Sequence, residues 1–243
     1  MGKRVGKTGV GAGGRKGVSA NGAGSNCDSR KRDAIASGLL LVLFILWTAV
    51  VCIVDVQPVG PNGSEVGLAT LNATFREFTG EHMGLYFATD YLSIIPIAIM
   101  FGFGLLGLVQ LVSRKSLVAV DRDLLVLGAF YVVLLATYIA FDAIALNYRP
   151  LLIEGKLEPS YPSSTTLLVL CVMATTAMQL NRRMGEGLLK KALLAAVVAF
   201  AAFMIVARLF SGVHWISDIV GGILLGGCFV MAYRAFAFAG PTS

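Results

Sequence analysis

The chain has 243 residues, of which 56% are hydrophobic and only 14% are charged, and its mean hydropathy is +0.78. A soluble domain carries about 25% charged residues, so this composition excludes an ordinary soluble protein and indicates an integral membrane protein. The net charge of +6 comes largely from the N-terminal segment and short loops, as membrane topology requires, and we expect no nucleic-acid partner.

The first 33 residues are rich in Gly, Ser and Asn and contain eight Lys or Arg residues. Such a segment cannot bury enough apolar surface to offset the entropy lost on ordering. We therefore predict that residues 1–33 form a disordered basic tail, placed near anionic lipid headgroups.

Six apolar runs follow, and each is long enough to cross a hydrocarbon core of about 30 Å. Backbone polar groups in lipid must be satisfied within the segment, so the runs are predicted to be helices. The fold class expected is all-α, a polytopic bundle of six transmembrane helices formed by residues 34–238. The runs lie near residues 34–56, 84–112, 124–147, 163–180, 191–210 and 213–238.

The segment 57–83 between the first two runs contains turn-forming residues and an amphipathic piece, Leu71–His82. It is predicted to be an outer loop that carries a short surface helix. His82 within it is interpreted as a solvated loop histidine.

Basic residues are concentrated in 1–33 and in the turns near 113–123 and 181–191. By the positive-inside rule both termini are predicted to be cytoplasmic, in a multi-pass protein of the cell membrane. This orientation brings three separate parts of the sequence, around Arg149, Ser163 and His214, to the outer face.

The stretch 207–218 is the most informative part of the sequence, since it places charged groups at the edge of the membrane, where they are costly and persist mainly for function or pairing. His214 and Asp218 are one helical turn apart. A carboxylate at that spacing can hold an imidazole in one tautomer and stabilise its protonated form. Arg208 adds a cationic fork that suits phosphate.

The junction of the third and fourth runs predicts a second half of the same site. Pro150 is expected to end the preceding helix and hold Arg149 at its outer end. Ser163 or Ser164 is expected to cap the next helix, whose first backbone N–H groups form an anion site.

These residues resemble the three ordered motifs of the type-2 phosphatidic acid phosphatase superfamily, membrane branch, and the resemblance covers about residues 34–238. The family motifs are Lys-x6-Arg-Pro, Pro-Ser-Gly-His and Ser-Arg-x5-His-x3-Asp. Here the third is complete except that Ala207 replaces its serine, and the first keeps Arg149-Pro150 but has Asp142 in place of its lysine. The second keeps Pro162-Ser163 and then reads Ser164-Thr165.

The resemblance implies a two-step phosphoryl transfer without metal or cofactor. His214 would attack phosphorus and form a phosphohistidine that water then hydrolyses, while Asp218 orients the imidazole. Arg149, Arg208 and the helix-start amides near Ser163 and Ser164 would hold the phosphate oxygens. The implied substrate is a lipid phosphate or a polyprenyl diphosphate, bound from the lipid bilayer.

Two departures from the motifs bear on this prediction. Thr165 stands at the position of the family's general-acid histidine, and loss of a general acid costs roughly 10²–10⁴-fold in rate. Asp142 puts an anion where the family has a cation, and it is expected to pair with Arg149 or Arg208. Asp90 is expected to be a polar partner within the bundle, without a catalytic role.

Three classes of function remain open. A lipid phosphatase is favoured by the His214–Asp218 pair, with polyprenyl diphosphate best tolerating Thr165 because phosphate is a good leaving group; His82 is a candidate for the missing acid. The alternative is a catalytically impaired protein that binds lipid phosphates. A small transporter has less support, because no inverted repeat is evident. The oligomeric state is left open.

Glycine spacing predicts where helices approach one another closely. Gly222 and Gly226 form a GxxxG spacing in the last run, and Gly102, Gly104 and Gly107 lie on the second run. Small residues at such spacings are typical of packed transmembrane helices.

Overall fold

The computed structural model describes residue 2 and residues 20–238, and transmembrane-length helices dominate it. Six spans are long and apolar enough to cross a membrane, with α3 and α4 together forming one of them. The predicted all-α, six-span polytopic fold is thus confirmed. The helices are α1 (Ala20–Ile53), α2 (Ala69–Thr79), α3 (Met83–Leu92), α4 (Ile94–Arg114), α5 (Arg122–Ile144), α6 (Ser164–Arg183), α7 (Leu188–Phe210) and α8 (Ile216–Ala237).

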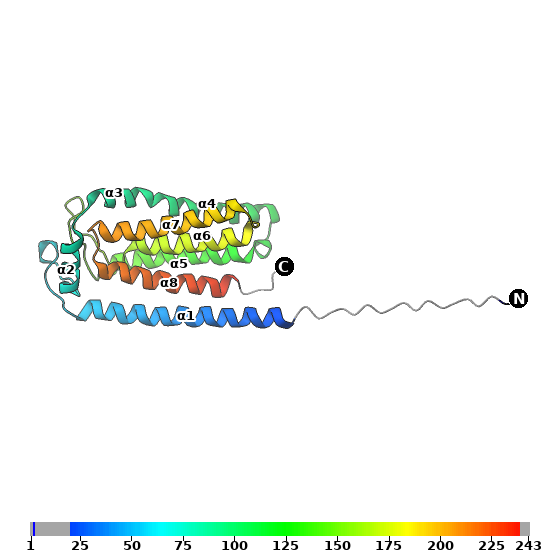
Figure 1. Ribbon diagram of the computed structural model, residues 1–243, viewed down its shortest axis with the longest axis horizontal. Coiled ribbons are helices and arrows are strands. Elements are labelled where there is room, and N and C mark those ends of the chain that lie inside the picture. Colours follow the sequence, from blue (N-terminus) through cyan, green and yellow to red (C-terminus); the bar gives the residue numbers. More distant parts are fainter. Residues whose placement is uncertain (1, 3–19, 239–243) are drawn as a thin grey trace.

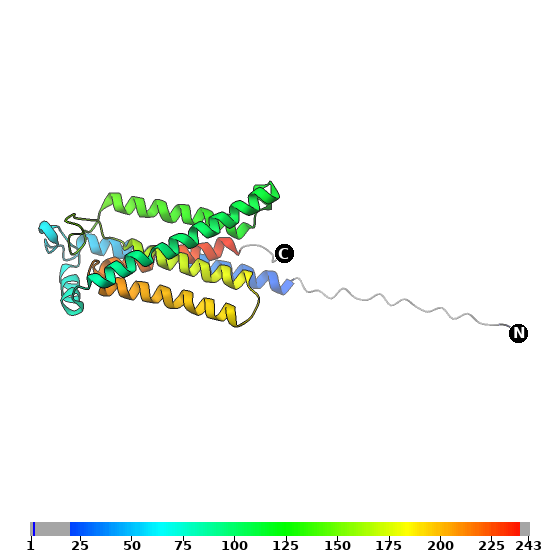
Figure 2. The same ribbon diagram turned by 90° about the horizontal axis from the view of Figure 1, so that it is seen from above.

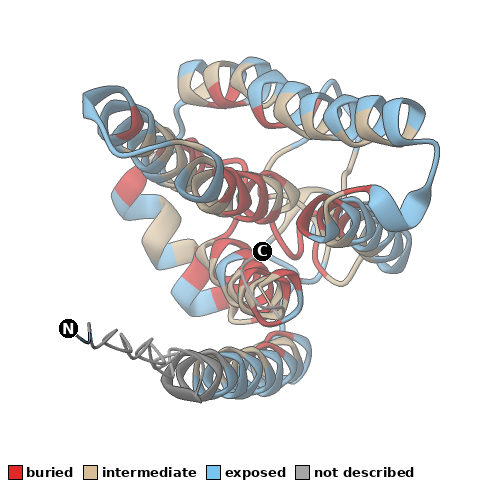
Figure 3. Cartoon of the chain, turned by 90° about the vertical axis from the view of Figure 1, so that its right-hand side faces the viewer, coloured by how far each residue is buried: buried red, intermediate tan, exposed pale blue. Residues whose placement is uncertain are grey.

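The spans run side by side, and α2 lies across one end of them (Figure 1). Figure 2 shows the same arrangement from above, with α3–α4 crossing over the other spans. Within the apolar 18-residue stretch of each span, 56% of the residues are buried in α6 and in α8, against 6–28% in the other spans. Figure 3 shows this concentration of buried residues in the middle of the bundle. These two helices therefore form the centre of the bundle, and Ser163, Thr165 and Asp218 lie at their first turns.

The central helix α6 is the least apolar span, yet its polar side chains are satisfied inside the bundle. The Thr175 and Thr176 hydroxyls donate hydrogen bonds to carbonyls one turn earlier on the helix, at 2.8 and 2.6 Å. Gln179 Nε2 donates to the Tyr233 hydroxyl on α8 at 2.7 Å. Burial of α6 therefore leaves these polar groups paired, as a buried interior requires.

The first helix begins earlier than the sequence predicted. α1 starts at Ala20, inside the segment 1–33 expected to be disordered, while residues 1 and 3–19 of that segment lie outside the described residues. Two contacts with the end of α8 support the extension: Arg30 Nε donates to the Ala235 carbonyl at 3.4 Å, and Asp33 pairs with Arg234 at 3.4 Å. These tertiary contacts were not visible in the local composition.

The second apolar run, predicted as one helix, is broken between α3 and α4 at Ser93. Pro96 explains the position of the break. A proline has no N–H for the carbonyl four residues earlier, here that of Leu92, and its ring clashes with that carbonyl. The two pieces still form one continuous span.

The third span ends earlier than expected. Pro150 was predicted to stop this helix, but α5 ends at Ile144 and Ala145 adopts a left-handed conformation with φ of 48°. The chain then forms a short hairpin in which the Arg149 N–H donates to the Glu158 carbonyl at 3.0 Å. Arg149 is therefore held by this hairpin and not by a helix end.

The short helix expected in the outer segment is present as α2. Buried Asn72 fixes it to the start of α8: its Nδ2 donates to Ser217 Oγ at 2.9 Å and its Oδ1 accepts the Ser217 N–H at 3.2 Å. Asn72 Nδ2 also donates to the Gly67 carbonyl at 2.8 Å. This segment is consequently attached to the element that follows His214.

A polar network joins α4, α5 and α6 at the end of the bundle opposite α2 (Figure 1). Asp121 Oδ2 accepts from Gln110 at 2.9 Å and from Arg183 at 3.1 Å, while its Oδ1 accepts from Arg114 at 3.0 Å. The hydrogen bond from Gln110, followed by those from the two arginines, lowers the pKa of Asp121 to about 2. The Asp121 carboxylate is therefore ionised in the folded protein at neutral pH.

Glycines on α8 do permit close packing against α6. A Cβ at Gly222 would lie 3.0 Å from the Ser163 carbonyl, and one at Gly226 would lie 2.9 Å from Leu170 Cδ2. The corresponding prediction for α4 is wrong, because Cβ atoms at Gly102, Gly104 and Gly107 would meet nothing within 4 Å. Those three positions face away from the other helices.

We predict that Gly222→Leu lowers the free energy of unfolding by roughly 1–3 kcal/mol, since overpacking displaces α6 from α8. The matched control is Gly104→Leu, which adds the same atoms to an open face. Thermal unfolding midpoints in detergent measure both. Equal midpoints for the two variants would contradict the packing assignment.

Candidate active site

Several of the residues predicted to form the site meet at the α2 end of the bundle. They come from the hairpin after α5, the start of α6, the end of α7 and the start of α8. Arg208 and Thr165 are in direct contact, His214 lies beside Asp218, and Ser163 contacts Asp218 through the backbone.

Arg208 is the best-held residue of this group, although only 2% of it is exposed. Its Nη2 donates to Thr165 Oγ1 at 2.7 Å, and its Nη1 donates to Thr89 Oγ1 at 3.0 Å. The guanidinium also lies over the Tyr86 ring, 5.1 Å from the centroid, and Asp90 Oδ1 is 3.7 Å from Nη2. Its Nε has no hydrogen-bond partner among the described residues.

His214 lies in the turn between α7 and α8 and is 5% exposed. Its Nδ1 is 3.6 Å from Asp218 Oδ2, which is longer than a hydrogen bond. That oxygen instead accepts the Trp215 N–H at 3.0 Å and so caps α8. Both ring nitrogens of His214 and Oδ1 of Asp218 lack hydrogen-bond partners within the described part of the chain.

A glycine gives the turn before His214 its shape. Gly212 has φ of +74°, a left-handed conformation that side chains disfavour. A Cβ there would also lie 2.8 Å from the Gly80 carbonyl and 3.1 Å from Glu81 Cα. The segment before α3 is bonded to the same turn, where the His82 N–H donates to the Ser211 carbonyl at 3.0 Å.

Ser163 caps α6, as the sequence predicted, since its side chain accepts the Thr166 N–H at 3.5 Å. Its own N–H donates to the backbone carbonyl of Asp218 at 3.0 Å. The cap therefore joins the start of α6 to the start of α8. Ser164 is the first residue of α6 and lines a neighbouring pocket.

Arg149 lies on the hairpin after α5, where its Nε is 3.2 Å from Glu158 Oε2. Its side chain is 13% exposed. Nη1 is buried and has no hydrogen-bond partner in residues 20–238. One edge of this guanidinium is therefore available to an anion.

The imidazole of His214 is held in its neutral form. Burial lowers the pKa of His214 well below its usual value of 6.5, and the charges of Arg149 and Arg208 lower it further, while the backbone of Ser160 acts in the opposite direction. A neutral imidazole keeps a lone pair for reaction near neutral pH.

Asp90 and Asp142, the two aspartates for which the sequence predicted polar partners, differ in what they contact. Asp90 contacts Arg208, as expected for a polar partner. The predicted pairing of Asp142 with an arginine is wrong: Arg149 pairs with Glu158, and Arg208 pairs with Asp90. The helix α5 ends too early to bring Arg149 back to Asp142 along its own axis.

Sequence reasoning missed several residues that hold the site. Tyr86 and Thr89 contact Arg208 from α3, and buried Ser160 shares the electrostatic environment of His214. The only sequence signal for α3 was Asp90, one residue after Thr89. His82 Nε2 lies 3.0 Å from the Thr79 carbonyl, so its ring already has a local partner.

The residue types in this group suit an anion. Unpaired buried polar atoms are rare in proteins and mark places where a ligand or water belongs. Here two guanidinium groups, which suit tetrahedral oxyanions, occur with a neutral imidazole. Among residues 20–238, no cluster of three or more His, Cys, Asp or Glu side chains is arranged to hold a metal ion.

A family model matches residues 126–240, and its description is the PAP2 superfamily. The match contains all three motif regions, and it confirms the resemblance to the type-2 phosphatidic acid phosphatases inferred from the sequence. No curated protein sequence matches the chain.

One solved structure similar to this chain is a transmembrane PAP2-type phosphatidylglycerolphosphate phosphatase from Bacillus subtilis. The TM-score is 0.50 at 18% sequence identity, and the alignment covers 83% of this chain and 95% of the other. At that identity the likeness concerns the fold.

We predict that His214 remains neutral as the pH falls below 6.5, since its pKa is lowered by burial and by two arginines. The unfolded chain binds a proton there that the folded chain does not, so the protein loses stability as the pH falls through this range. Nitrogen NMR of the imidazoles tests this, because the chain has only two histidines.

A His82→Gln variant leaves His214 as the only histidine signal. Adding Arg208→Gln to that variant is expected to raise the titration midpoint of His214, because one of the lowering charges is gone. Titration of His214 at 6.5 or above in the single variant would contradict the buried neutral state.

Proposed function

We propose that this chain, whose residues 126–240 match the PAP2 superfamily, is a membrane phosphatase that removes a phosphate from a lipid phosphate or a polyprenyl diphosphate. The observation that carries the proposal is the buried group of unpaired atoms on Arg149, Arg208, His214 and Asp218. Unpaired guanidinium donors beside an unpaired imidazole suit a phosphoryl group better than water alone.

In the proposed reaction a ring nitrogen of neutral His214 attacks phosphorus, and the bond to the leaving group breaks. Arg208 and Arg149 stabilise the charge on the phosphoryl oxygens, which is the main task of the protein in phosphoryl transfer. Asp218 stabilises the positive imidazole as the phosphohistidine forms. Water then attacks the phosphohistidine and releases inorganic phosphate.

The substrate preference follows from Thr165. Its hydroxyl is already the acceptor for Arg208 at 2.7 Å, and a hydroxyl is too weak an acid to protonate an alkoxide leaving group. Attack on the terminal phosphorus of a polyprenyl diphosphate expels a polyprenyl phosphate, which needs much less protonation than an alkoxide. We therefore place polyprenyl diphosphate ahead of phosphate monoesters such as phosphatidic acid.

The site is proposed to face the outer side of the membrane. The ends of the spans far from α2 carry the basic turns, including Arg114, Arg183 and Arg234. By the positive-inside rule those ends and both termini are cytoplasmic. Substrate would then reach the site from the outer leaflet.

The second candidate is a lipid-phosphate-binding protein with little or no turnover. It is favoured by the 3.6 Å separation of His214 and Asp218 and by the absence of a histidine at Thr165. Binding requires only the two arginines. Phosphate release and lipid binding, measured on the same samples, separate the two candidates.

We predict that His214→Ala abolishes phosphate release, because the nucleophile is lost, and that Arg208→Ala lowers it by at least 10²-fold, as for loss of other charge-stabilising groups. Phosphate release is measured in detergent without added metal, with polyprenyl diphosphate and phosphatidic acid side by side. The control is His82→Ala, which removes the other histidine.

Turnover of His214→Ala at the wild-type rate would eliminate the proposed nucleophile. If the wild type releases no phosphate but binds the lipid phosphate, and Arg208→Ala weakens that binding, the binding protein is the correct candidate. A large loss in His82→Ala would assign the missing acid to His82.

We predict that Thr165→His raises hydrolysis of phosphatidic acid more than that of polyprenyl diphosphate, because an added acid assists the poorer leaving group. Thr165→Val is the comparison, since it removes the acceptor for Arg208 without adding an acid, and it should lower both rates. Initial rates for the two substrates give the ratio. Equal gains for both substrates in Thr165→His would refute the leaving-group argument.

A further inference from the structure

Each arginine of the proposed phosphate site is faced by a carboxylate. Arg208 Nη2 lies 3.7 Å from Asp90 Oδ1, and Arg149 Nε lies 3.2 Å from Glu158 Oε2. The two carboxylates come from separate elements, since Asp90 is on α3 and Glu158 is on the hairpin after α5. Both arginines lie close enough to His214 for their charges to lower its pKa. The positive charge around His214 is therefore already matched by two protein anions.

Neither carboxylate is bonded firmly to its arginine. The separation of 3.7 Å between Asp90 and Arg208 is longer than a hydrogen bond. Arg149 Nε is close enough to Glu158, but it has no hydrogen-bond partner among the described residues, so the two groups are poorly aligned. The carboxyl groups of Asp90 and Glu158 make no further ion pair in residues 20–238. Both contacts are thus loose ion pairs.

The two members of each ion pair differ in exposure. The side chains of Asp90 and Glu158 are 58% and 38% exposed, whereas those of Arg208 and Arg149 are 3% and 13% exposed. Arg208 is also fixed by two hydrogen bonds to threonine hydroxyls. Ion pairs open to solvent contribute little to stability, so a carboxylate can move into solvent at low cost while the guanidinium stays in place. An incoming anion therefore replaces the carboxylates and leaves the arginines where they are.

We propose that Asp90 and Glu158 are exchangeable anions, which neutralise the two arginines of the empty site and are displaced by the phosphoryl group of the substrate. The proposal rests on the function proposed above. Competition from a carboxylate weakens the binding of every anion at the arginines, and specificity is the difference between such affinities. A lipid phosphate is held in addition by its hydrocarbon chain in the bilayer, whereas free phosphate is not. The two carboxylates therefore select membrane-bound phosphates and promote the release of inorganic phosphate.

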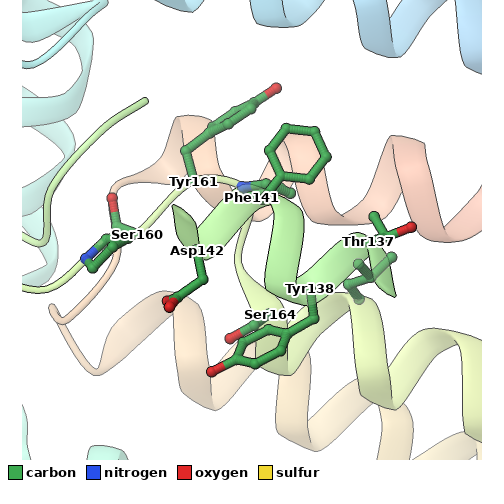
Figure 4. A pocket seen from close by; sticks show the side chains of 10 residues that line it. Thr137, Tyr138, Phe141, Asp142, Ser160, Tyr161 and Ser164 are labelled. Carbon is green, nitrogen blue, oxygen red and sulfur yellow. The ribbon is translucent and has the colours of Figure 1, made fainter. Parts of the chain in front are cut away.

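Asp142 provides a comparison with the same side chain. It lines a small pocket between α5 and the loop that precedes α6, together with Ser160 and Ser164 (Figure 4). Asp142 is exposed, and within the described part of the chain it makes no ion pair with either arginine. Because solvent and salt screen an exposed charge, its removal should leave anion binding at the arginines unchanged.

The test measures the dissociation constant of inorganic phosphate by phosphorus NMR titration of the full chain in lipid nanodiscs. We expect Asp90→Asn and Glu158→Gln each to tighten phosphate binding by about fivefold, roughly the contribution of one solvent-exposed ion pair. The double variant should bind phosphate more tightly than either single variant. With polyprenyl diphosphate as substrate, inhibition by inorganic phosphate should strengthen by the same factor. The control Asp142→Asn should keep the wild-type affinity.

The sign of the change separates this role from a structural one. If Asp90 and Glu158 only hold the arginines in position, their removal loosens the guanidinium groups, and phosphate binding becomes weaker or stays unchanged. Either result would overturn the exchange, and turnover of polyprenyl diphosphate by the same wild-type sample would leave the phosphatase intact. Glu158 lies on the hairpin outside the spans, so Glu158→Gln decides the outcome if Asp90→Asn does not fold.

The binding measurement is independent of catalysis. Tighter phosphate binding in the two variants supports the exchange even if no sample releases phosphate from a lipid, in which case the phosphatase proposal fails alone. If neither the wild type nor any variant binds inorganic phosphate, the arginines do not form an anion site, and the exchange is wrong together with the proposed function.

Discussion

The burial of one guanidinium group is the constraint on which the arrangement of the site depends. Arg208 is almost completely inside the bundle, and a buried charge is tolerated only when it is paired and hydrogen-bonded. Its partners come from α3 and α6, two helices distant in sequence. The same side chain therefore aligns three helices, and its buried Nε is left without a hydrogen-bond partner among the described residues. In the proposed function, both stability and anion binding depend on this one residue.

The site contains side chains that are fixed by hydrogen bonds and side-chain atoms that have no hydrogen-bond partner. Arg208, Ser163 and Asp218 each have fixed partners. The ring nitrogens of His214 and Nη1 of Arg149 have no hydrogen-bond partner in the part of the chain that the structure describes. Thr165 belongs to the fixed side chains, because its hydroxyl accepts a hydrogen bond from Arg208. A residue at that position thus affects the orientation of the phosphate-binding group as well as the supply of protons. In the proposed mechanism, this double role would make the leaving group the feature by which substrates are distinguished.

Sequence reasoning predicted the spans, the cap at Ser163 and the meeting of the Arg208 region with the start of α6, because hydropathy and helix-cap chemistry are local properties. It failed where the structure is decided by contacts between distant elements. The early start of α1 depends on Ala235 and Arg234, and the end of α5 depends on the hairpin around Arg149. The pairing predicted for Asp142, with Arg149 or Arg208, rested on helix spacing and on a shared outer face, and the structure pairs those arginines with Glu158 and Asp90. Likewise, apart from Asp90, nothing in the local sequence indicated that α3 contacts Arg208 through Tyr86, Thr89 and Asp90.

The contact between Gly212 and the segment before α3 has a consequence for evolution and engineering. Gly80 and Glu81 lie against Gly212, two residues before His214. The His82 N–H is also bonded to the Ser211 carbonyl, so the segment before α3 and the turn that contains His214 are packed together. A change in the length or shape of residues 80–82 displaces the imidazole, although these residues precede it by more than a hundred positions. Outer loops exchanged between related chains must therefore be exchanged together with the turn that contains His214.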